Sequence, residues 1–226
     1  MGAVPITSPR LFLHSGKTDQ DAMQALIQPE QLVTANNPQL VLRHGQQWLE
    51  PATASLWLEQ LQQEVPWKQE SIQLYGKRHL LPRLTCWMAD PGCGYRYSGL
   101  DNVVEPWSPV AETLRHQLSE VCGWRFNSLL LNLYRSGRDA MGFHADDEPE
   151  LNPDAPIASL SLGASRTFRF KPKKGHQGDD LDLELGHGDL LLMEPPTQQH
   201  WLHGLPKRLR VDQSRLNLTF RVVQQA

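Results

Sequence analysis

The chain has 226 residues, 39% of them hydrophobic and 21% charged, with a formal net charge of −3. These values suit one soluble globular domain with a sizeable core, alone or with an N-terminal extension. No apolar run approaches the roughly 18 residues of a membrane span, and the N-terminus lacks the basic-then-apolar order of a signal peptide. Three cysteines without a CxxC pair argue against a disulfide framework or zinc knuckle, so we expect a cytoplasmic protein, or a nuclear one in a eukaryote.

Basic residues gather in two stretches, 77–83 and 165–176, and neither stretch contains an acid. They are Lys77, Arg78 and Arg83, and then Arg166, Arg169, Lys171, Lys173 and Lys174. The acids nearest to the second stretch follow it over residues 179–184. A basic face that contacts nucleic-acid phosphates is one interpretation, and ordinary solvated loops are the other.

Residues 1–70 are predicted to form an accessory region. Within it, we expect helices over residues 19–27 and 52–64, with a strand over 39–43 between them. The second helix carries apolar residues on one side and stops at Pro66.

A further helix is predicted between Ser108, which can cap its start, and Gly123, which can end it. Pro109 suits the first helical position. Apolar residues recur at helical spacing at Val110, Leu114, Leu118 and Val121.

Short strands separated by Gly, Pro and Asp dominate from Phe126 onward. The expected ranges are 127–134, 157–163, 166–171, 181–185, 189–193, 199–203 and 215–223. This pattern indicates a sandwich or jelly roll, so the fold class is α+β and mainly β. The last strand alternates: leucines and Phe220 fall on one side, and Arg215, Asn217, Thr219 and Arg221 on the other. That polar side is either solvent-exposed or suited to a buried anion.

His144 and Asp146 stand two residues apart, so on an extended strand both side chains point the same way. The third ligand of a metal site would come from the C-terminal histidines, which are His176, His187, His200 and His203. Two His and one carboxylate leave three positions of an octahedron open, as in non-heme iron(II) oxygenases. An arginine that grips a carboxylate, such as Arg215 or Arg221, would complete a site for a 2-oxo acid.

Five segments resemble AlkB-family dioxygenases, in the order and spacing of the family's nuclear repair branch. They are Asn132–Gly137, His144–Glu148, Ile157–Gly163, His200–His203 and Arg215–Arg221. The resemblance runs from about residue 74 to 223 and implies a double-stranded β-helix (jelly roll) with flanking helices and an N-terminal extension. It implies domain bounds of 1–70 for the accessory region and 71–226 for the dioxygenase, with a nucleotide-recognition lid at about 71–100.

The resemblance also implies roles for individual residues. The iron ligands would be His144, Asp146 and His203, the last preferred to His200 because it is the second His of the HWxH-like segment. The 2-oxoglutarate contacts would be Asn132, Tyr134, Arg215, Asn217 and Arg221, with Arg215 on the distal carboxylate. The substrate contacts would be Asp147, a wedge formed by Tyr75, Gly76 and Lys77, and lid aromatics Tyr95 and Tyr97 that sandwich the base.

The implied activity is oxidative demethylation of 1-methyladenine- or 3-methylcytosine-type bases in DNA, with Fe(II), 2-oxoglutarate and O2. We expect a monomer that binds methylated DNA, or RNA, and no membrane. The alternatives are a methylated RNA or protein side chain as the target, a non-catalytic nucleic-acid-binding relative, and a zinc hydrolase. The last leaves Arg215 and Arg221 unexplained.

Overall fold

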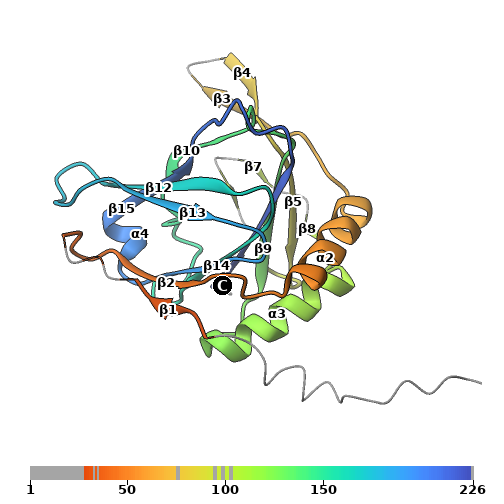
Figure 1. Ribbon diagram of the computed structural model, residues 1–226, viewed down its shortest axis with the longest axis horizontal. Coiled ribbons are helices and arrows are strands. Elements are labelled where there is room, and N and C mark those ends of the chain that lie inside the picture. Colours follow the sequence, from red (N-terminus) through yellow and green to blue (C-terminus); the bar gives the residue numbers. More distant parts are fainter. Residues whose placement is uncertain are drawn as a thin grey trace, which may run out of the picture.

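The computed structural model describes residues 28–32, 34, 36–74, 77–93, 96–97, 100–101 and 104–224. Two facing β-sheets make up most of this part of the chain, and two long helices lie against the larger sheet (Figure 1). The predicted mainly β sandwich or jelly roll is thereby confirmed. No helix in the described ranges is long and apolar enough to cross a membrane.

The larger sheet has eight strands and the smaller sheet four. The larger sheet runs in the order β1 (Glu30–Gln31), β2 (Val41–Gly45), β14 (Leu190–Glu194), β11 (Ile157–Gly163), β16 (Arg215–Arg221), β9 (Ser128–Tyr134), β5 (Leu84–Ala89) and β8 (Val104–Glu105). The smaller runs β10 (Met141–His144), β15 (Trp201–Leu205), β12 (Arg166–Pro172) and β13 (Leu181–Leu185). Two short hairpins, β3 (Ser71–Leu74) with β4 (Lys77–Leu80) and β6 (Arg96–Tyr97) with β7 (Leu100–Asp101), stand apart from both.

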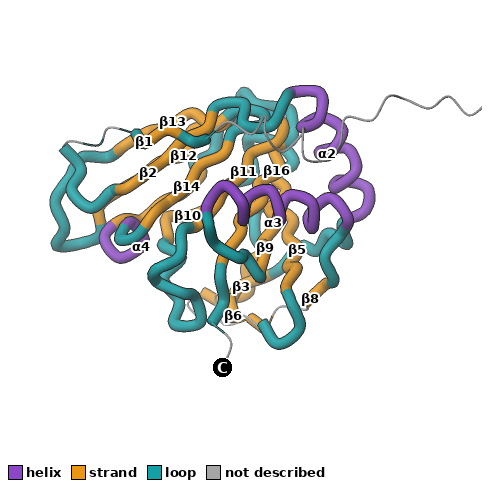
Figure 2. The backbone as a smooth tube through the Cα atoms, turned by 90° about the horizontal axis from the view of Figure 1, so that it is seen from below, coloured by secondary structure: helices purple, strands orange, loops and turns teal. Residues whose placement is uncertain are grey.

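The helices α2 (Pro51–Glu64) and α3 (Pro109–Cys122) cover the outer face of the larger sheet (Figure 2). Their buried residues, among them Leu61 and Leu114, form one core with Leu216, Leu218 and Phe220 of β16. The start of α3 is capped as predicted, because Ser108 Oγ accepts a hydrogen bond from the N–H of Ala111. Gly123 ends it at φ 68°, in the left-handed region that glycine tolerates.

The polar side of β16 faces the smaller sheet rather than solvent. All seven residues of β16 and all seven of β9 are buried. A second apolar cluster lies between the sheets and includes Phe168, Phe170 and Met193. The polar residues of the central strands are therefore enclosed on both sides, so the solvent-exposed interpretation was wrong.

The expected N-terminal accessory region contributes directly to the larger sheet. β2 pairs with β14 over five residues, from Val41 opposite Glu194 to Gly45 opposite Leu190. Leu42 is fully buried, and α2 packs in the main core. The expected boundary at residue 70 thus falls within one continuous sheet and core, while the helix expected over 19–27 lies outside the described residues.

The strand expected over residues 199–203 differs from the structure. Residues 197–200 form a short helix, α4 (Thr197–His200), and the strand β15 begins only at Trp201. Thr197 is fully buried, and its hydroxyl bonds both the N–H and the carbonyl of Val41. This side-chain anchor to β2 holds the helical turn, a tertiary contact that strand propensity does not reveal.

Candidate metal and co-substrate site

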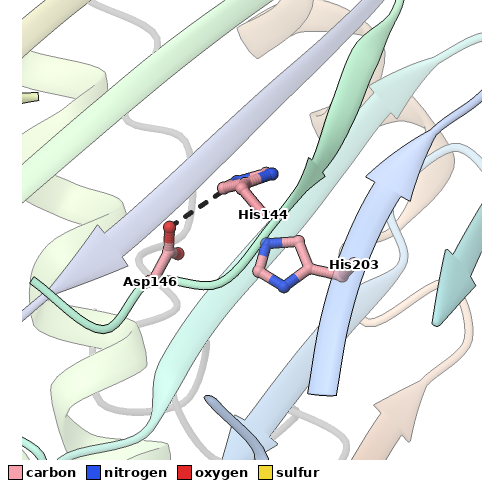
Figure 3. Close-up of side chains that lie close together, drawn as sticks. All are labelled: His144, Asp146 and His203. Carbon is pink, nitrogen blue, oxygen red and sulfur yellow. Dashed lines mark ion pairs between the residues drawn. The ribbon is translucent and has the colours of Figure 1, made fainter. Parts of the chain in front are cut away.

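Three side chains expected to bind iron lie together between the sheets (Figure 3). His144 ends β10, Asp146 follows two residues later, and His203 lies opposite His144 on the neighbouring strand β15. Ligand atoms of the three residues all lie within 4.8 Å of one another. The ring centroids of the two histidines are 4.3 Å apart, and His144 Nε2 is 3.7 Å from Asp146 Oδ1. The structure therefore brings His203, and not His200, to the HxD segment.

The protonation states of this triad suit a metal. Burial, with His144 nearby, lowers the pKa of His203 to about 3, so its ring is neutral at neutral pH. Burial opposes the charge of Asp146, but Arg221 and both histidines outweigh it and hold the pKa of the carboxyl below its ordinary value. His144 Nδ1 lies 3.0 Å from the carbonyl of Gly142, which fixes the proton on Nδ1 and leaves Nε2 as the donor to a metal.

Asp146 is held by two contacts that leave one oxygen for a ligand. Arg221 donates to Oδ2 from Nε at 3.0 Å and from Nη2 at 2.8 Å. The N–H of Asp146 donates to Gln198 Oε1 at 3.0 Å. The buried Oδ1 has no hydrogen bond within the described part of the chain and faces His144. Such an orphaned carboxylate oxygen beside two imidazoles fits a divalent metal ion.

Arg215 is a buried cation without an acidic partner. Only 1% of the residue is exposed, and no acid within the described ranges forms an ion pair with it. Its Nη2 donates to Ser161 Oγ at 2.8 Å, while its buried Nε has no hydrogen bond there. Burial lowers the pKa of Arg215 to about 10, so it still carries its charge at neutral pH. A buried guanidinium with open donors fits the carboxylate of a small acid.

The other residues expected to contact 2-oxoglutarate lie beside the triad. Asn132 and Tyr134 on β9 stand directly opposite Asn217 and Arg215 on β16. The guanidinium of Arg215 lies 5.6 Å from the centroid of the Tyr134 ring. The triad lines one cavity together with four of the expected 2-oxoglutarate contacts, Asn132, Tyr134, Asn217 and Arg221. Five residues that the sequence did not predict as contacts complete the lining: Met141, Ser159, Phe168, Met193 and Thr219.

Asp147 does not line this cavity and is exposed, whereas the preceding Asp146 is buried. Its Oδ2 accepts from Lys173 Nζ at 2.6 Å. Asp146 and Asp147 both line a second, larger cavity of about 130 Å³, which Gln198, Leu151 and Pro195 help to enclose. The wedge residues Tyr75 and Gly76 and the lid residue Tyr95 lie outside the described residues. For Lys77 in β4 and Tyr97 in β6, only the strand position is described.

Several basic residues of the stretches 77–83 and 165–176, where a basic face was one interpretation, are buried or paired with acids. Arg166 is 1% exposed, and its guanidinium donates to the carbonyls of Ser136, Asp139 and Pro206. Arg169 pairs with Asp182 and Lys171 with Asp180, because β12 and β13 are neighbours in the smaller sheet. The acids that sequence places after the basic stretch therefore fold back onto it.

Arg83 has a role at the site that charge alone did not indicate. It is 3% exposed, and its Nε donates to Asn132 Oδ1 at 2.7 Å, which orients the amide. Ser159 accepts from Asn217 Nδ2, as Ser161 accepts from Arg215. A signal for these serines was present, since they alternate on β11 toward the polar side of β16. No sequence signal pointed to Arg83 or Gln198.

Comparisons with known proteins agree with this geometry. Residues 41–221 match the model of the 2OG-Fe(II) oxygenase superfamily. DNA oxidative demethylase ALKBH2 of Mus musculus is 43% identical over 181 residues, or 76% of each chain. The human ALKBH2 is 44% identical over 67% of this chain and 60% of its own length. Human alpha-ketoglutarate-dependent dioxygenase alkB homolog 3 is 45% identical over 74% of this chain and 60% of its own length.

A solved structure gives independent support for the architecture. That of OsALKBH1 covers 80% of this chain and 96% of its own, with a TM-score of 0.53 and 18% sequence identity. At this identity the likeness concerns the fold alone.

Proposed function

Because the chain belongs to the 2OG-Fe(II) oxygenase superfamily, and within it to the AlkB homologues, we propose that it removes methyl groups oxidatively from alkylated bases in DNA. The family uses Fe(II), 2-oxoglutarate and O2. The observation that carries the proposal is the His144–Asp146–His203 cluster in one cavity with Tyr134, together with the buried Arg215, which lies 5.6 Å from the Tyr134 ring and has no ion pair with an acid in the described part of the chain. The ALKBH2 relatives, which are DNA oxidative demethylases, support DNA as the substrate.

The residues divide the work of binding. His144, Asp146 and His203 would hold Fe(II), and Arg215 would pair with the distal carboxylate of 2-oxoglutarate. Arg221 favours the ionised form of Asp146 and binds only its Oδ2, which would leave Oδ1 to bind the metal. Asn132, Tyr134 and Asn217 would line the co-substrate, while Phe168 and Met193 keep water from the cavity. When bound, the iron supplies oxidation of the methyl group by O2, with 2-oxoglutarate converted to succinate and CO2, and the hydroxymethylated base then releases formaldehyde.

A base stacked inside a duplex cannot reach this enclosed site, so the substrate is single-stranded or flipped out. A methyl on N1 of adenine or N3 of cytosine blocks pairing and lowers the cost of flipping. We propose that Tyr95 and Tyr97 stack on the base, that Asp147 contacts it, and that Tyr75, with Gly76 and Lys77, fills the gap in the duplex. The protein would act as a monomer on nucleic acid in the cytoplasm or nucleus.

The test measures formaldehyde and succinate from methylated DNA and RNA oligonucleotides supplied with Fe(II) and 2-oxoglutarate, with and without O2. We expect O2-dependent release of both products, faster on DNA, and none from the Asp146→Ala variant. Faster turnover of methylated RNA would replace DNA as the substrate. Base release or hydrolysis without O2 would point to a hydrolase and contradict the proposal.

A further inference from the structure

A second pair of histidines lies outside the triad, where β12 ends and β15 begins in the smaller sheet. His200 is the last residue of α4, and His176 lies in the loop that joins β12 to β13; in Figure 1 both elements lie on the same side of the molecule. Their Nδ1 atoms are 2.9 Å apart. The backbone holds the two segments together, because the N–H of Lys173 donates to the carbonyl of His200 and the N–H of His176 to that of Lys173.

The separation of the nitrogens fits one kind of metal coordination. With metal–nitrogen bonds of about 2.0–2.1 Å, two ligands at a right angle have their nitrogens about 2.9 Å apart, and two at a tetrahedral angle about 3.4 Å. The observed 2.9 Å matches the right angle of square-planar or octahedral ions.

The ring orientation supports the same conclusion. Two imidazoles whose nitrogens pointed straight at each other across a hydrogen bond of this length would have centroids about 5.2 Å apart. Two rings aimed at a shared ion at a right angle would have centroids about 4.5 Å apart. The observed centroids are 4.6 Å apart and the rings are 76° from parallel, which is closer to the separation expected for two rings that share an ion.

The local charges permit a cation at this point. Desolvation, with His176 and Lys173 nearby, lowers the pKa of His200 below its ordinary value, which favours the neutral ring that a metal binds. The ammonium of Lys173 is bound to Asp147 at 2.6 Å, which offsets its repulsion. No third His, Cys, Asp or Glu side chain joins the pair within the described residues, so the remaining coordination positions are open to water or an added ligand.

We propose that His176 and His200 form a second metal site that takes a divalent transition ion with right-angled coordination, such as Cu(II) or Ni(II). Because both side chains reach the surface, the ion exchanges with solvent more easily than one in the triad. The site lies on the turn that carries Lys173, and through that lysine it adjoins Asp147.

The experiment titrates the full chain with Cu(II) alone, using calorimetry for stoichiometry and electron paramagnetic resonance for the coordinating nitrogens. We expect two equivalents in the wild type, one at the triad and one at the pair. His176→Gln and His200→Gln should each weaken one of them by at least about tenfold. His203→Ala should weaken the other and keep the pair, so the outcome is independent of the proposed function.

His116→Gln serves as the matched control, since His116 is an exposed histidine that pairs with Glu112. It should bind Cu(II) like the wild type. If His176→Gln and His200→Gln retain the wild-type stoichiometry and spectrum, the two rings share a hydrogen bond only, and the metal site is refuted.

Discussion

At the scale of single residues, two buried arginines on the strand β16 differ in their partners. Arg221 has its counter-charge, since Asp146 Oδ2 accepts two of its N–H groups. Arg215, six residues earlier on the same face, donates to the hydroxyl of Ser161 and has no ion pair with an acid among the described residues. A buried cation without an anion is costly, so it persists where a ligand supplies the missing charge. We therefore propose that Arg215 binds the carboxylate of a ligand, while Arg221 also holds Asp146.

Arg215→Lys tests this role of Arg215. An ammonium is a point charge and cannot reproduce the two-point grip of a guanidinium on a carboxylate. We expect the KM for 2-oxoglutarate to rise by about tenfold or more, with a smaller change in kcat. Steady-state succinate formation measures both. Arg169→Lys, on the exposed side of β12, is the control, and an unchanged KM in Arg215→Lys would rule out the carboxylate role.

Gln198 offers a second test at this scale, because it holds the backbone of Asp146 rather than touching the metal. Gln198→Leu removes the acceptor for the Asp146 N–H while keeping similar volume. We expect iron affinity to fall by about tenfold, with the Co(II)-substituted absorption spectrum altered. Gln199 lines the same cavity of about 130 Å³ as Gln198, so Gln199→Leu is the control and should leave the iron affinity and the Co(II) spectrum unchanged. A wild-type spectrum in Gln198→Leu would contradict a positioning role.

At the scale of elements, Asp189 joins β2 to the start of β14. Its Oδ1 accepts from the N–H of Gln47, and its Oδ2 accepts from the N–H of Gly186 and lies 3.2 Å from His44 Nε2. Burial opposes its charge, but His44 and the two backbone donors outweigh this and lower the pKa of the carboxyl. The carboxylate of Asp189 thus links β2 and the turn after it to β14 in the larger sheet.

Asp189→Asn should lower the free energy of unfolding by about 1–3 kcal/mol, because hydrogen bonds to a buried charge are replaced by weaker ones. Since folding depresses this pKa, the contribution is present above the ordinary Asp range near pH 4 and is lost as pH falls through the folded value. Urea unfolding at pH 7 and below pH 4 measures both effects. The exposed Asp182→Asn should change little at pH 7. A pH-independent difference between wild type and Asp189→Asn would contradict the linkage.

At the scale of the whole molecule, substrate handling is expected from two hairpins that stand apart from the main sheets. β3–β4 carries the expected wedge and β6–β7 the expected lid. The outer side of β12 carries paired charges rather than a basic face. We therefore expect recognition of the base and the gap to depend more on these hairpins than on the charges of β12.

Two tyrosine substitutions separate wedging from stacking. Tyr75→Ala should reduce duplex repair by about tenfold more than single-strand repair, because only the duplex leaves a gap to fill. Tyr95→Ala should reduce both alike, since stacking contributes about 1–3 kcal/mol per base in either substrate. Formaldehyde release from matched methylated oligonucleotides provides the measurement. Equal losses for Tyr75→Ala on both substrates would remove the wedge.

Local sequence by itself determined several of the elements and their faces. Ser108 and Pro109 mark the start of a helix and Gly123 its end, because capping and φ preferences are properties of neighbouring residues. The alternation of Arg215, Asn217, Thr219 and Arg221 placed four polar side chains on one face of a strand for the same kind of reason. The resemblance added His203 as the third ligand, which spacing alone left open among four histidines.

Only the tertiary structure decided which polar groups are enclosed and which charges meet. Arg83 and Arg166 look like surface cations in sequence, yet one orients Asn132 and the other binds three carbonyls. Strand pairing between β12 and β13 sets Arg169 beside Asp182, and the chain fold sets His176 beside His200. These contacts join segments 13 to 49 residues apart in the chain, a separation that no local preference can encode because it depends on how the sheets pack.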